Sequence, residues 1–262
     1  ADDTVSVWVV IRMLAIATVA CMALGYAIER FAYRPLRSAP RLNSLITAIG
    51  VSFLLENVFQ LPYVFGPNPG TFPSIKWNSP SVAVAGFRIR NEQILILFGT
   101  LVVLLVCRHI ILKTRMGLAI RAASFHHDHA RLMGVNVNRV ISFTFMLGSG
   151  LAACAGVFVG LYQAQPDALM GVNAGLKAFT AAVFGGIGSL PGAVVGGLLM
   201  GLSETYIAGS ALSNFRDAFA FLLLIVILLV RPSGLLGKIP FKARRFVVVP
   251  QALHRADRYR LG

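Results

Sequence analysis

The sequence predicts an all-α membrane protein, a polytopic transmembrane helical bundle with about six membrane segments. Hydrophobic residues make up 56% of the 262 residues and charged residues only 13%, whereas a soluble domain usually carries about 25% charged residues. Apolar runs of about 20 residues, the length that crosses a bilayer, recur along the chain. The 25 glycines fit the close helix packing found in lipid.

The distribution of the basic residues supports this class. Of the 24 Lys and Arg residues, 18 lie in the segments 30–41, 108–139 and 231–260. Clustering of this kind marks the cytoplasmic side of a membrane protein. The net charge of +14 therefore predicts contact with membrane lipid rather than nucleic acid, because no nucleic-acid-binding motif accompanies it.

Four spans are predicted in the first two thirds of the chain. The second of them contains Glu56, and a carboxylate near mid-membrane costs about 2.5–3.5 kcal/mol, so it should face a partner or a cavity. The alternative is that Glu56 lies near the outer end of its span. The outer segment that follows contains SVAVAGFRI, which fits a short hairpin or an interfacial piece. The four predicted spans are 5–28, 45–61, 93–112 and 140–161.

A basic, polar loop at 113–141 separates the third and fourth spans. Five of its residues recur at helical spacing and predict one face of a short amphipathic helix. Gly134 can supply the left-handed residue that ends this helix. Its apolar face has to meet either the membrane surface or a partner protein. The five residues are Leu118, Ala122, Phe125, His129 and Leu132.

The glycine-rich stretch 175–204 predicts either one long broken helix or two short helices that meet at GSLPG, with Pro191 at the break. Non-helical backbone at membrane depth is tolerated only inside protein or along a cavity. The stretch is therefore a candidate lining for a transport path, with a tightly packed helix pair as the alternative. The candidate path residues are Glu56, Gly185, Gly186, Gly188, Pro191 and Gly192.

These segments and a last span at 215–230 predict one membrane domain over 1–237. A basic tail at 238–262 is expected on the cytoplasmic surface.

No Walker A motif occurs, so an ATPase driving this chain would be another subunit. No arrangement of catalytic residues is evident, and neither an enzyme nor a cofactor is expected. The cluster HHDH at 126–129 fits a solvated helix face better than a metal site, because neighbouring ligands on one helix cannot all converge.

Several motifs together resemble one family. ERFAYRPLR (29–37), LITAIGVSFLLEN (45–57), MGLAIRAAS (116–124) and RPSGLLG (231–237) are similar to the permease subunits of branched-chain amino-acid ABC transporters, most closely the LivH type. The resemblance covers roughly residues 25–237 in the same order. It implies a multi-pass protein of the bacterial inner membrane. It also implies a second permease subunit of the LivM type, two cytoplasmic ATPase subunits and a periplasmic amino-acid-binding protein.

The resemblance also implies that residues 122–134 form the cytoplasmic helix that docks on an ATPase. Phe125, Leu132 and Met133 would insert as apolar contacts, and Arg121 and Arg131 would lie at the rim. The implied coupling set is Arg121, Ala122, Phe125, Arg131, Leu132, Met133 and Gly134.

Two departures from the family keep alternatives open. The family has further helices before ERFAYRPLR, so this chain is expected to be truncated, and a non-transporting fragment or scaffold is one alternative. Import of urea or short amides by the same fold is another. HHDH also departs from the family and leaves the individual docking contacts open.

Overall fold

The structure is a computed structural model of residues 1–262 and divides into two compact units, Ala1–Val172 and Asn173–Gly262. The predicted tail 238–262 and most of the outer segment lie outside the residues that the structure describes. The described residues are 7–38, 40–64, 66, 82–84, 87–89, 91–125, 127–163, 169–186, 188–210, 213–231 and 233–237.

The predicted polytopic helical fold is confirmed. Within the described residues, five helices are long and apolar enough to cross a membrane. A shorter apolar stretch, Phe221–Val230, belongs to α9. Helices suit these runs because a helix satisfies its own backbone hydrogen bonds in lipid. The five long helices are α1 (Val7–Ile28), α2 (Arg41–Gln60), α3 (Asn91–Lys113), α6 (Val137–Gln163) and α8 (Leu190–Ala208).

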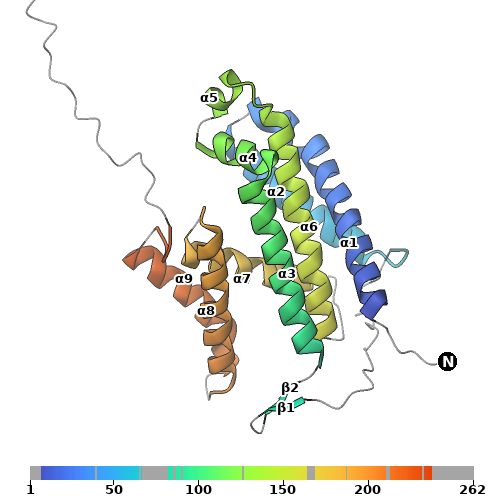
Figure 1. The fold of residues 1–262 in the computed structure, drawn as a ribbon, viewed down its shortest axis with the longest axis vertical. Helices are drawn as coiled ribbons and strands as arrows, with labels where there is room; N and C mark the ends of the chain where they lie inside the picture. The colour runs from blue at the N-terminus through green and yellow to red at the C-terminus, as the bar shows by residue number, and fades with distance from the viewer. Residues whose placement is uncertain are drawn as a thin grey trace, which may run out of the picture. The chain divides into compact units, whose positions relative to one another are not determined.

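In the first unit, α1 packs against α6, and α3 lies along the other side of α6 (Figure 1). The buried side chains of Val10, Phe158 and Leu161 join α1 to α6 near one end. Close approach elsewhere depends on small residues: Gly25 faces Ser149, and a Cβ in place of its hydrogen would overlap that side chain. This packing holds the ends of α1 and α6 in a fixed relation.

The two ends of the first unit differ. At one end lie η1 (Glu29–Tyr33), η2 (Pro35–Ser38), α4 (Arg115–Phe125) and α5 (His127–Leu132), which belong to two of the predicted basic segments (Figure 1). At the start of α3 lie β1 (Val82–Val84) and β2 (Phe87–Ile89), which pair antiparallel. The hairpin alternative for SVAVAGFRI is therefore confirmed.

The second unit contains most of α7 (Met170–Gly185), α8, η3 (Ser213–Phe215) and α9 (Arg216–Val230). Of the two predicted alternatives, two separate helices are observed, and they are joined across GSLPG. Ser189 caps α8 by accepting the Gly192 N–H at 3.2 Å, and Pro191 lies in its first turn. Gly186 and Gly188 have φ of 110° and 89°, which glycine adopts without strain.

The RPSGLLG motif closes the end of α7. The backbone N–H groups of Leu235 and Leu236 donate to the carbonyls of Phe184 and Gly185, each at 2.9 Å. The last carbonyls of a helix have no partner within the helix, so this segment supplies what α7 lacks. A Cβ on Gly186 would overlap the backbone of Gly237, which explains why glycines meet here.

Candidate functional site

The loop 113–141 folds differently from the expectation of one amphipathic helix. It forms two helices, α4 and α5, separated at position 126. Ala123 of α4 and Ala130 of α5 both lie in a buried cluster with Val137 and Val140. The sequence periodicity carries no sign of the separation into two helices.

The residues implied to dock on an ATPase lie largely on the exposed side of this loop. Leu132 and Met133 are 84% and 85% exposed, and Leu118 is 62% exposed. Ala122, Arg121 and Arg131 are exposed as well, whereas the side chain of Phe125 lies outside the described residues. Ala123 and Ala130 are thus buried against the protein. The large apolar side chains of Leu118, Leu132 and Met133 are exposed.

Gly134 ends α5 as predicted. Its φ is 79°, and its N–H donates to the Arg131 carbonyl at 3.0 Å. The N–H of Val135 donates to the Ala130 carbonyl, also at 3.0 Å. These two bonds and the left-handed glycine form a Schellman motif. The motif fixes the direction in which the chain leaves α5 and enters α6.

A buried charged cluster, which sequence reasoning missed, ties this end of the unit together. Glu29 in η1 is fully buried; it accepts a charged hydrogen bond from Arg37 and one from the Ser142 hydroxyl at 2.6 Å. Arg37 also donates to the Asn138 side chain. These four residues, called the Glu29 cluster below, join the ends of α1 to the first turns of α6. The only sequence signal was one acidic residue within an arginine-rich motif.

A second charged pair lies between α7 and α8. The Lys177 ammonium donates to the Glu204 carboxylate at 2.6 Å, with the side chains 30% and 15% exposed. Charged groups within membrane helices are costly and tend to be paired and functional. Sequence reasoning passed over both residues, although two charges in a glycine-rich apolar stretch were a usable signal.

The candidate path residues are not all brought together. Gly185 and Gly192 lie at the α7–α8 contact, where each faces the other's backbone, and Gly186 is covered by the RPSGLLG motif. Gly188 and Pro191 are exposed in and after the turn. Glu56 belongs to the first unit, half-buried on α2. Close helix packing accounts for the buried glycines, and a role in a path stays a prediction.

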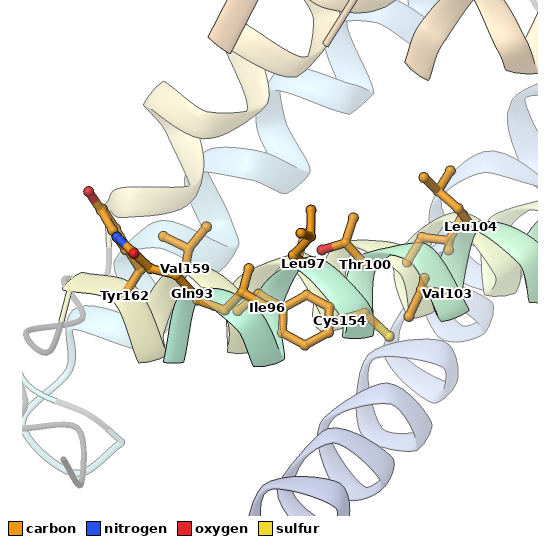
Figure 2. A pocket seen from close by; sticks show the side chains of 12 residues that line it. Gln93, Ile96, Leu97, Thr100, Val103, Leu104, Cys154, Val159 and Tyr162 are labelled. Atoms are coloured by element: carbon orange, nitrogen blue, oxygen red, sulfur yellow. The ribbon is translucent and has the colours of Figure 1, made fainter. Parts of the chain in front are cut away.

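An apolar groove of about 680 Å³ runs between α3 and α6. Figure 2 shows Gln93 and Tyr162 at one end of it and Val103 and Leu104 at the other, with Thr100 between them. The lining is otherwise apolar along membrane-spanning helices. Such a groove meets lipid or another helix, and its residues by themselves define no chemistry.

The fold and these sites define a polytopic helical membrane protein with an exposed apolar surface at one end of its first unit. The sequence matches the family described as branched-chain amino acid transport system permease component over residues 4–230. The chain belongs to this family.

Several relatives match most of the chain, among them a LivH and a BraD protein. The high-affinity branched-chain amino acid transport system permease protein LivH of Escherichia coli (strain K12) is 40% identical, over 85% of this chain and 72% of the relative. The corresponding protein BraD of Pseudomonas aeruginosa is 41% identical, over 82% and 71%.

A more distant relative is the inner membrane ABC transporter permease protein YjfF of Escherichia coli, which is 29% identical over 71% of this chain and 55% of the relative. No solved structure matches the chain significantly.

Proposed function

We propose that this chain is a membrane-spanning permease subunit of an ATP-binding-cassette importer for branched-chain amino acids. Its similarity to LivH and BraD over more than four fifths of its length supports the substrate class. The observation that carries the coupling role is the exposed apolar side of α4–α5. Leu132 and Met133, at 84% and 85% exposure, would lie in a cleft of a separate cytoplasmic ATPase.

Burial of these two side chains would supply a large part of the docking energy. Complete burial of a Leu or Met side chain contributes about 1.5–3 kcal/mol, so the pair contributes about 3–6 kcal/mol before the costs of association. Arg121 and Arg131 would lie at the rim, where charges direct association more than they add affinity. The loop 113–141 and the tail would then be cytoplasmic.

Motion of the ATPases would reach the membrane helices through two rigid connections. The Schellman motif at Gly134 links α5 to α6, so a displacement of α5 tilts the start of α6. The Glu29 cluster then links α6 to η1 and α1. Coupling of this kind needs an element with two arrangements that both partners bias. Our candidate for it is the α1–α6 pair, which would move as one body.

The α7–α8 pair is the proposed wall of the path, with Glu56, Gly188 and Pro191 as further candidates. A zwitterionic amino acid needs a partner for its ammonium and one for its carboxylate. Lys177 and Glu204, which pair with each other, would offer one charge of each sign when their ion pair opens. A second permease subunit of the LivM type would complete the path, and a periplasmic binding protein would deliver the substrate.

Crosslinking tests the docking. Leu132→Cys and Met133→Cys, in a chain whose three native cysteines are replaced by alanine, should each crosslink to an ATPase subunit in the assembled complex. Ala130→Cys is the matched control, because Ala130 lies on the same helix but is only 5% exposed. Absence of ATPase crosslinks from both exposed positions, in complexes that contain the ATPase, would refute the proposed coupling surface.

The substrate is tested separately. The binding protein encoded with this chain, once purified, should bind leucine, isoleucine or valine in a calorimetric titration. Uptake of the same amino acid should depend on this chain. Binding of urea or a short amide in their place would move the substrate to that class without affecting the docking result.

A further inference from the structure

A basic pocket of about 460 Å³ lies where α1 and η1 meet the starts of α4 and α6. Arg30, Arg34 and Arg139 line its polar part, and Phe143 and Met146 line its apolar part. We propose that this pocket binds the anionic headgroup of a membrane phospholipid, with the phosphate held by the arginines. The proposal stands apart from the transport function, since the pocket is a property of this chain alone.

The charge of the pocket is uncompensated within the described residues. Glu29 is close in sequence, but it is fully buried and already bonded to Arg37 and Ser142. No carboxylate of the described part pairs with Arg30, Arg34 or Arg139. Guanidinium groups bind phosphate oxygens in a bidentate manner. Three of them around one pocket therefore fit a phosphate group.

The apolar part of the pocket indicates a lipid rather than a soluble anion. Phe143 and Met146 belong to the membrane-spanning stretch Val137–Tyr162, and Tyr26, which also lines the pocket, belongs to Trp8–Tyr33. The lining therefore changes from charged at the helix ends to apolar along the helices. A phospholipid has the same order of headgroup and acyl chain, and basic pockets between membrane helices are known headgroup sites.

The pocket also touches the Glu29 cluster. Asn138 and Ser142 line the pocket and at the same time hold Arg37 and Glu29. An occupied pocket would therefore stabilise the joint between α1 and α6. This gives the bound lipid a structural role beyond simple adhesion at the membrane surface.

The test compares two double variants of the assembled transporter. Arg34→Gln/Arg139→Gln removes two pocket charges, and Arg108→Gln/Arg115→Gln removes two exposed charges outside the pocket. Each complex is exchanged into nanodiscs that contain equal amounts of phosphatidylglycerol and phosphatidylcholine. The complex is then extracted in mild detergent, and native mass spectrometry counts the lipids that stay bound.

We expect wild-type complexes to retain at least ten times as much phosphatidylglycerol as phosphatidylcholine. This comparison uses the wild-type protein alone, so it does not depend on the folding of any variant. Each pocket arginine contributes about 1 kcal/mol near an anionic surface, which corresponds to about a fivefold change. The pocket double variant should therefore lose about 25-fold in retention. The control double variant should stay within about twofold of wild type.

Four results would overturn the proposal. The first is no preference for phosphatidylglycerol in wild type, and the second is equal loss in both double variants. The third is unchanged lipid retention with weaker ATPase association in the pocket variant, which would make the arginines a protein contact. Displacement of the bound lipid by millimolar inorganic phosphate would assign the pocket to a free anion and would also overturn it.

Discussion

Two adjacent glycines of α8 provide a sharp test of the α7–α8 contact. A Cβ at Gly196 would overlap the carbonyl oxygen of Ala181 and lie 2.7 Å from the backbone nitrogen of Gly185. A Cβ at Gly197 would meet nothing within 4 Å. Gly196→Ala should therefore force the two helices apart, whereas Gly197→Ala should not.

The magnitude follows from the difference between the two variants. Each substitution gains the same helix propensity, about 1 kcal/mol, so this contribution cancels. What remains is the overpacking cost at Gly196, about 1–3 kcal/mol. We expect the upper part of this range, because the opposing atoms at Ala181 and Gly185 are backbone atoms that cannot rotate away.

A buried reporter measures this difference. Met200 is 5% exposed and packs against Ala181, so a cysteine at this position reacts only when the helix pair opens. In a chain without native cysteines, Gly196→Ala should speed thiol labelling about 5- to 150-fold over Gly197→Ala, the factor that 1–3 kcal/mol gives. Equal labelling rates in the two variants would show that α7 and α8 do not meet through their backbones.

Three further changes test the charged clusters and the end of α5. Glu29→Gln should lower the free energy of unfolding by about 1.5–3 kcal/mol, because the charged hydrogen bond from Arg37 is lost; thermal denaturation of the purified chain measures this. Gly134→Val should cost about 1–3 kcal/mol in backbone strain and reduce substrate-stimulated ATP hydrolysis, with Gly134→Asn as the tolerated control. Lys177→Met alone should destabilise the chain more than Lys177→Met/Glu204→Met, because the single change leaves the Glu204 carboxylate without its charged partner. A lower free energy of unfolding for the double variant than for the single variant would contradict this prediction.

Apolar runs were sufficient to predict the long helices, since hydrophobicity and length are local properties. The third span was predicted at 93–112 and observed as Asn91–Lys113. The fourth was predicted at 140–161 and observed as Val137–Gln163. Both helices extend into polar residues at their ends, where hydropathy gives no boundary. The break at GSLPG was predictable because Pro191 and the glycines before it disfavour a continuous helix.

The missed features depend on contacts between distant residues. Glu29 and Ser142 are 113 positions apart, and nothing local marks either as the other's partner. The loop forms two helices, α4 and α5, with Ala123 and Ala130 buried against the start of α6. Regular spacing from Leu118 to Leu132 is equally compatible with one helix. Tertiary packing, which a single sequence does not display, decided these points.

The RPSGLLG motif has a consequence for biosynthesis. The carbonyls of Phe184 and Gly185 accept from the N–H groups of Leu235 and Leu236, about 50 residues further along the chain. At a translation rate of about 5–20 residues per second, roughly 3 to 10 seconds pass between the emergence of these two segments. A nascent chain arrested at the end of α9 would therefore contain α7 and α8, but the carbonyls of Phe184 and Gly185 would still lack these donors. Its protease sensitivity should fall only once the ribosome has passed this motif.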